Sequence, residues 1–245
     1  MRTLSGRELL SLWEQCEPLH PVDQALAIVA AARPEIPPDE LGRLSLGQRD
    51  ALLLELREAL FGHAMEAFVE CPLCQEHLVF SMSTAEIRSM APGGDASGAT
   101  TLTVEGVSLD YRLPNSEDLA AIVGAPGLEA ARMELLRRCV VGAHQDGQPV
   151  NPRDLPQPVI DALSAEIESR DPLAELRTDV ACPACGHGWS PVLDVTAFLW
   201  TEISMQVKQL LRDVHQLARW YGWREADILA MSGRRRQLYL EMANG

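Results

Sequence analysis

The sequence predicts an α+β protein that is mostly helical, and three observations support this fold class. Two Cys-Pro-x-Cys units, Cys71–Cys74 and Cys182–Cys185, each lie between short strand-like segments. Residues 75–181, which separate the units, contain another hairpin pattern and further helix patterns. Residues 194–221 contain no proline or glycine and repeat apolar residues every three or four positions. We therefore expect zinc-ribbon-like β-hairpins with an inserted hairpin-plus-helices subdomain and a long C-terminal helix.

The composition indicates an ordinary globular chain. It has 245 residues, of which 47% are hydrophobic and 23% charged, enough for one large domain or two small ones. Its formal net charge of −14 repels phosphate backbones and anionic membrane surfaces. The first helical stretch is charged, unlike a secretory signal, and the longest apolar run, residues 25–32, is far short of the ~20 residues that cross a bilayer. We expect a soluble cytoplasmic chain with neither a membrane nor a nucleic acid as its partner.

The first region, residues 1–62, is predicted to be helical. A serine or proline stands at the start of each helix pattern, and a proline or glycine follows its end. Ser45 and Gln48 also have the spacing of a capping box. The three expected helices cover residues 5–16, 21–32 and 45–62. A proline-rich link at residues 34–38 separates the last two.

The two Cys-Pro-x-Cys units are predicted to be the halves of one metal site, built from residues 63–82 and 174–193. Strand-like segments flank the units at residues 65–70, 77–82, 179–181 and 189–193. Two residues between cysteines let both thiolates turn to one side of a tight turn, so each unit supplies half of a tetrahedral site. The expected ligands of a structural Zn²⁺ are Cys71, Cys74, Cys182 and Cys185.

Other interpretations of these cysteines remain open at this point. A thioredoxin-type pair would lie between a strand and a helix rather than between strands. A rubredoxin-type iron site uses the same turns and is not distinguished by sequence. His77 or His187 can replace a thiolate, although four cysteines already complete a site. A four-thiolate site is closed and leaves no position for a catalytic water, which favours a structural role.

The inserted subdomain, residues 83–173, is predicted to contain one hairpin and about three helices. Residues 101–104 and 107–113 alternate around Glu105-Gly106 as hairpin strands do. Ser116 is the expected cap of the following helix. Further helices are expected at residues 128–141 and 158–170. Loops are expected at residues 91–98 and 142–156.

Residues 194–245 are predicted to be a C-terminal helical docking region. The long helix carries an apolar stripe. We expect this stripe to pack within the chain rather than against a partner helix, because it is too short for a coiled coil. Gly222 should end this helix, and two short helices should follow, the second capped by Ser232. The stripe consists of Ile203, Val207, Leu210, Val214, Leu217 and Tyr221.

No catalytic constellation is visible in the sequence. The six histidines are scattered, and none lies in a His-Glu-x-x-His pattern or beside a nucleophile motif. A dinucleotide-binding fingerprint and a Gly-x-Ser-x-Gly elbow are also absent. The remaining cysteines, Cys16 and Cys139, lie on apolar helical faces as buried small hydrophobes do. We therefore expect no enzyme and no small-molecule substrate.

The C-terminal sequence reads DVHQLARWYGWREADILAM at residues 213–231, followed by SGRRRQLYLE at residues 232–241. In these residues most strongly, the chain resembles small baseplate proteins of contractile phage tails and related contractile injection systems. The likeness extends more loosely to the turn at residues 113–119 and to the paired Cys-Pro-x-Cys units. The nearest named group is the T-even phage baseplate hub (assembly) protein family.

This resemblance implies a non-enzymatic structural or assembly component of a baseplate, whose partners are other baseplate, spike, tube or sheath proteins. An aromatic and arginine-bearing C-terminus suits docking, because large aromatic residues dominate interface energetics when buried. A zinc-ribbon regulator that binds nucleic acid through its arginines is the alternative. A metal-dependent hydrolase would need an open coordination position. The candidate partner-binding residues are Trp220, Tyr221, Trp223, Arg234, Arg235, Arg236 and Tyr239.

Overall fold

The fold is α+β and mostly helical, as the sequence predicts. The computed structural model describes residues 3–90 and 99–244, so the loop expected at residues 91–98 lies outside the described residues. The helices are α1 (Gly6–Cys16), α2 (Pro21–Ala32), α3 (Pro38–Arg43), α4 (Leu46–Phe61), α5 (Thr84–Ser89), α6 (Ser116–Ile122), α7 (Leu128–Cys139), the 3₁₀ turn η1 (Pro152–Asp154), α8 (Gln157–Arg170), α9 (Val195–Tyr221), α10 (Glu225–Leu229) and α11 (Gly233–Asn244). The strands are β1 (Ala64–Glu70), β2 (His77–Ser83), β3 (Thr100–Val104), β4 (Val107–Tyr111), β5 (Val140–Gln145), β6 (Gln148–Pro149), β7 (Val180–Ala181) and β8 (Gly188–Trp189).

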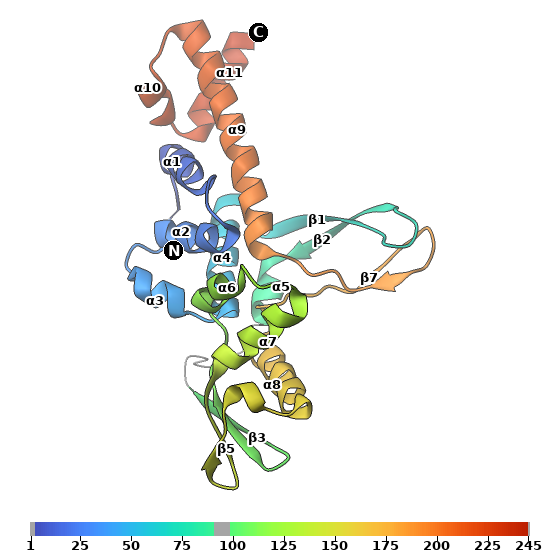
Figure 1. Ribbon diagram of the computed structural model, residues 1–245. Coiled ribbons are helices and arrows are strands. Elements are labelled where there is room, and N and C mark those ends of the chain that lie inside the picture. The colour runs from blue at the N-terminus through green and yellow to red at the C-terminus, as the bar shows by residue number, and fades with distance from the viewer. Residues whose placement is uncertain (1–2, 91–98, 245) are drawn as a thin grey trace.

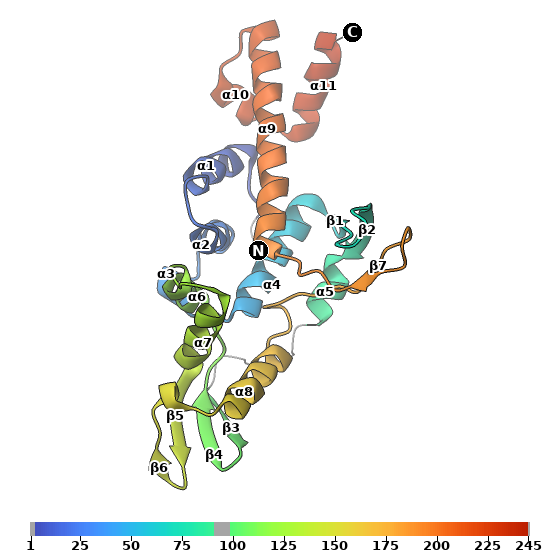
Figure 2. The same ribbon diagram turned by 45° about the vertical axis from the view of Figure 1, so that its right-hand side comes forward.

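Helix α9 runs from the middle of the molecule to the end that carries the C-terminus (Figure 1). Its first half packs against α2, α4 and α1, and its second half against α10 and α11, which Figure 2 shows on either side of it. The predicted stripe is buried from Ile203 to Leu217 within the main hydrophobic core, whereas Tyr221 at its end is partly exposed. The stripe is therefore an intramolecular core face. Among the described residues, no helix is both long and apolar enough to span a membrane.

The predicted helix caps are largely confirmed. Ser5 and Ser45 each accept a hydrogen bond from the third helical residue, whose side chain in turn accepts one from the cap's N–H. Gly222 ends α9 in the left-handed conformation, with φ of 68°. One predicted cap is wrong, because Asn115 rather than Ser116 caps α6. Helix α3 was not predicted. It begins at Pro38, the last residue of the proline-rich link, because proline fits the first turn of a helix.

The inserted residues contain a second hydrophobic core, formed by strands β4 and β5, helices α7 and α8 and nearby loop residues. The predicted hairpin is the first half of a four-stranded antiparallel sheet in the order β3-β4-β5-β6. The prediction of a loop at residues 142–156 is therefore wrong, and α7 ends at Cys139, two residues before its expected end. Asp146 and Gly147, both with positive φ, make the tight β5–β6 turn. Strand β5 forms because it pairs with β4, which lies about 30 residues earlier in the sequence.

The two cores meet at a buried polar junction at the start of α4. The Gly47 N–H donates to Asp171 Oδ2 at 3.0 Å, and the Leu46 N–H donates to the Pro114 carbonyl at 3.0 Å. A methyl group on Gly47 would lie 1.8 Å from Asp171 Oδ1. The carboxylate that satisfies this backbone N–H therefore leaves room only for glycine.

Replacing Gly47 by alanine should thus separate α4 from Asp171. We expect Gly47→Ala to lower the free energy of unfolding by about 1–3 kcal/mol, as other overpacking substitutions do. Urea denaturation measures the change. Gly124→Ala is the matched control, because nothing lies within 4 Å of its added methyl group. Equal stability of the two variants would contradict this account of the junction.

Candidate metal centre

Two hairpins, far apart in the sequence, extend from the body of the protein on the same side (Figure 1). Strands β1 and β2 pair antiparallel from Ala64↔Ser83 to Glu70↔His77. Strands β7 and β8 form a much shorter ladder, with an isolated bridge between Arg177 and Val192 at its base. Each hairpin carries one Cys-Pro-x-Cys unit at its tip, so the fold brings the units together.

The two tips have the same backbone geometry. In the first, the Gln75 N–H donates to the Cys71 carbonyl, and the Cys71 N–H donates to the Glu76 carbonyl, both at 2.9 Å. In the second, Gly186 and Cys182 repeat these two bonds at the same distances, the latter to the His187 carbonyl. The residue after the second cysteine has positive φ in both, 61° at Gln75 and 73° at Gly186. Two equivalent turns thus face each other.

The four sulfur atoms form one compact group in which all lie within 4.8 Å of one another. The Cys71 and Cys185 Sγ atoms are 3.7 Å apart, and those of Cys74 and Cys182 are 3.5 Å apart. Tetrahedral coordination with metal–sulfur bonds of about 2.3 Å requires sulfur separations of about 3.8 Å. A disulfide requires about 2.05 Å. The observed spacing therefore fits a shared metal ion and does not fit two disulfides.

The environment of the thiols also suits a cation. Burial alone would raise the pKa of Cys71, but the backbone N–H groups of Cys74 and Leu73 point at its sulfur and hold its pKa at about 7. The Glu76 N–H lowers the pKa of Cys74, but the contacts of the Cys74 thiol with the neighbouring cysteines, that with Cys185 first, outweigh this effect and raise the pKa to about 12. The cluster thus stabilises one thiolate and resists a second. A bound divalent cation would remove that resistance.

The potential ligands in this group are the four cysteines alone among the described residues. Cys71 and Cys182 are buried, whereas Cys74 and Cys185 are exposed. His187 lies beside the group and stacks on Trp189, with ring centroids 6.0 Å apart, and His77 is exposed at the start of β2. Neither histidine belongs to the group. Four thiolates would saturate a tetrahedral ion, an arrangement suited to holding chain segments together.

The predicted docking residues lie around the C-terminal end of α9, whereas the cysteine hairpins extend sideways near its N-terminal end (Figure 1). Tyr221 and Trp223 stack with ring centroids 4.4 Å apart, and Tyr239 meets Trp223 edge-on at 4.8 Å. The Arg235 guanidinium lies 5.6 Å from the centre of the Tyr239 ring. Trp220 is 62% exposed. Trp223 and Tyr239 pack partly against the main core, so they serve the fold as well as the surface.

The three consecutive arginines do not form one exposed cluster. Arg234 and Arg235 are exposed, whereas Arg236 is only 8% exposed. Its Nε lies 3.6 Å from Asp213 Oδ2, and its Nη1 donates to the Met231 carbonyl at 3.2 Å. Arg236 therefore links α11 to α9. Of the three arginines on which the nucleic-acid-binding alternative relies, only two are therefore exposed.

The sequence profile of a family described as "T4 bacteriophage base plate protein" matches residues 23–199, which is most of the chain. The chain belongs to this family. No curated protein matches this baseplate protein, and no solved structure matches it. Its family assignment gives it a structural role in a phage baseplate.

The matched range shows which parts of this baseplate protein carry the family likeness. It contains both Cys-Pro-x-Cys units and the turn at residues 113–119. It ends within the first turns of α9 and leaves out residues 213–241, on which the resemblance in the sequence was strongest. The baseplate assignment is thus confirmed by the body of the protein rather than by its C-terminal helices.

Proposed function

We propose that this protein is a non-enzymatic structural subunit in the baseplate of a contractile phage tail or tail-like injection system, stabilised by a structural Zn²⁺. The observation that carries the proposal is the four-cysteine group, which lies within the matched baseplate range. A closed thiolate site joins two distant hairpins and offers no open position to a substrate. Such a site contributes rigidity, which an assembly component requires.

Zinc would be held by Cys71, Cys74, Cys182 and Cys185. Bound there, it would supply the folding free energy that ties the hairpins together. The backbone N–H groups of Leu73, Cys74, Glu76 and His187 point at three of the sulfurs and would share their negative charge. Metal analysis of purified protein should find one zinc and no iron per chain.

The C-terminal helices would dock on neighbouring subunits. The proposed surface, which we call the C-terminal aromatic patch, consists of Trp220, Tyr221, Trp223, Tyr239, Arg234 and Arg235. Tyrosine, tryptophan and arginine are the residues most enriched at the centres of protein interfaces. Arg236 is left out because its guanidinium is used within the fold. The partners would be other baseplate, spike, tube or sheath proteins.

The two hydrophobic cores support the proposed division of the chain. Residues 1–62 and 194–245 supply most of the main core, and residues 83–173 supply the second one. Residues 63–82 and 174–193 form the hairpin module between them. In this arrangement the metal-bearing hairpins, the inserted sheet and the C-terminal helices point in three directions, so one subunit can contact several neighbours (Figures 1 and 2).

The test is deletion of the gene in the cells that produce the particles. We expect electron microscopy to show particles without complete baseplates, and the wild-type gene on a plasmid to restore them. A Trp220→Ala gene should restore assembly poorly, whereas Leu128→Ala, which also removes an exposed apolar side chain, should restore it fully. Normal particles in the deletion strain would contradict a structural role.

A further inference from the structure

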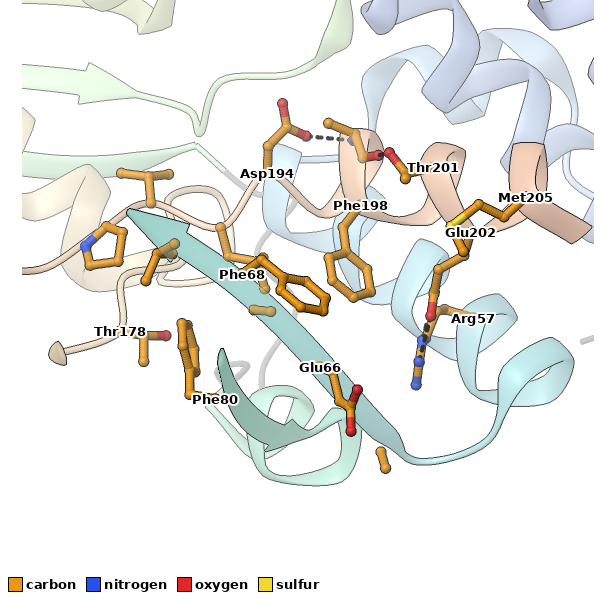
Figure 3. A pocket seen from close by; sticks show the side chains of 17 residues that line it. Arg57, Glu66, Phe68, Phe80, Thr178, Asp194, Phe198, Thr201, Glu202 and Met205 are labelled. Atoms are coloured by element: carbon orange, nitrogen blue, oxygen red, sulfur yellow. Dashed lines mark hydrogen bonds and ion pairs between the residues drawn. The ribbon is translucent and has the colours of Figure 1, made fainter. Parts of the chain in front are cut away.

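An apolar groove of about 810 Å³ lies between strand β1 and the first turns of α9 (Figure 3). Phe68 from β1 and Phe198 from α9 both point into it. Phe68 is 74% exposed and Met205 is 66% exposed, although both are large apolar side chains. Exposed apolar residues gathered in one groove commonly mark an interaction site.

The groove follows the outer edge of β1. Successive side chains of a strand point to opposite faces of its sheet, yet Glu66, Ala67, Phe68 and Val69 all line the groove. Only Phe80 lines it from β2. The free edge of β1 therefore faces the groove. In the described part of the chain, β1 pairs with no strand except β2, so this edge presents unpaired backbone groups.

The charges around the groove are predominantly acidic. Glu66, Asp194 and Glu202 contribute carboxylates, and Arg57 is the one basic residue that lines the groove among those the structure describes. Arg57 is already used, because it donates to both carboxylate oxygens of Glu202 at 2.7 and 2.9 Å and to the Gly62 carbonyl at 2.7 Å. The two other carboxylates are exposed, and Glu66 has no ion-pair partner among the described residues. A basic side chain would complement this rim.

We propose that an extended segment of a neighbouring baseplate subunit docks in this groove as a third strand beside β1. The segment would alternate apolar residues with at least one Lys or Arg. The free strand edge supplies main-chain hydrogen bonds, the aromatic groove takes the apolar side chains, and Glu66 takes the basic one. The seven residues of β1 span about 23 Å, which sets the length of the docked strand. This inference rests on the proposed baseplate function.

A second copy of this chain fits the groove less well. Its one run of consecutive exposed arginines in the described residues, Arg234 and Arg235, lies on the α11 helix, whose residue Arg236 is held against α9. A helix cannot add to a strand edge. The proposed metal site would also support the groove, because it joins the chain segments on both sides of it. Strand β1 leads into the first cysteine pair, and residues 191–194, which line the opposite wall, follow the second pair.

The test uses photocrosslinking in intact particles. Phe68→p-benzoylphenylalanine is incorporated in the producing cells, the particles are purified, and a blot establishes that they contain the chain before irradiation. We expect one adduct, with a segment of another baseplate polypeptide that alternates apolar and basic residues. Leu128→p-benzoylphenylalanine, an exposed position on α7, should not yield that adduct.

The outcomes separate the two proposals. Particles that contain neither the position-68 variant nor the position-128 variant before irradiation would overturn the proposed function and, with it, the docking inference. Particles that contain the chain but give no adduct at position 68, or an adduct with a second copy or an acidic segment, would overturn the inference alone. A synthetic peptide of the adduct segment provides the second readout. Glu66→Lys should weaken its binding at least tenfold at low salt, whereas Glu129→Lys on α7 should leave it unchanged.

Discussion

Replacing Cys182 by serine is expected to abolish zinc binding and to unfold the second hairpin while the helical body stays folded. Cys182 is the one buried residue between Arg177 and Asp194, so the hairpin has almost no apolar core of its own. Strands β7 and β8 contain two residues each. Structural zinc contributes about 10–16 kcal/mol in small metal-binding peptides, far more than such a ladder provides.

Two measurements check this expectation. Metal analysis should fall from one zinc per chain to none, and hydrogen exchange should lose protection at residues 176–193 while α4 and α9 keep theirs. Cys16→Ala is the matched control, because Cys16 is fully buried in the main core, away from the four-cysteine group. A Cys182→Ser protein that retains both metal and protection would contradict the metal-clamp account.

The second large effect is expected at Asp118, a carboxylate with 0% exposure. Arg112 donates to both its oxygens at 2.5 and 2.9 Å, and Arg138 Nε and the Asn115 N–H add bonds at 3.0 and 3.1 Å. We expect Asp118→Ala to lower the free energy of unfolding by about 2–3 kcal/mol, because it removes several charge-assisted hydrogen bonds, while Arg112 and Arg138 are about a third exposed and remain partly solvated. Asp161→Ala, at an exposed carboxylate on α8, should cost less than about 1 kcal/mol.

The same network predicts a pH dependence. Burial alone would raise the pKa of Asp118, but the bonds from Arg112 and the Asn115 N–H outweigh it and hold the pKa below its ordinary value. A carboxyl group with a lowered pKa stabilises the fold fully above its unfolded pKa of about 4 and loses that contribution as the pH falls below it. The stability difference between wild type and Asp118→Ala should therefore stay constant from pH 7 to about 5 and shrink below pH 4. A difference that is the same at pH 3 and pH 7 would contradict the assigned role of Asp118.

Elements with local signals could be predicted from the sequence. Helix α9 was predicted to within one residue, because Asp194 and Gly222 bound a continuous apolar period. The first hairpin and the capping boxes of α1 and α4 depend on residues within a few positions of one another. The fold class followed from these local patterns.

Elements created by distant contacts were not predicted. Strand β5 exists because it pairs with β4, and nothing in Gly142 or His144 marks a strand. The Asp146-Gly147 turn was the one signal that could have identified it. The Gly47–Asp171 contact joins residues that are far apart in sequence, so neither residue reveals it alone.

The candidate sites also differ in how far they could be predicted, depending on whether they rest on local or distant contacts. The cysteine spacing predicted which four residues would meet, because each unit is a local turn with known geometry. The sequence did not distinguish Arg236 from Arg234 and Arg235, since burial against Asp213 depends on how α11 packs on α9. The β1 groove was missed because Phe68 looked like an ordinary strand residue. The sequence does not show that the Phe68 side chain is exposed, or that it lies in a groove beside α9.

Tagging the chain in its native producer and sedimenting intact particles through a gradient tests the central claim most directly. The account predicts that the tag migrates with the sheath and tube and remains with them at high salt, as a resident baseplate subunit would. A tag that stays at the top of the gradient while complete particles sediment without it would contradict the account.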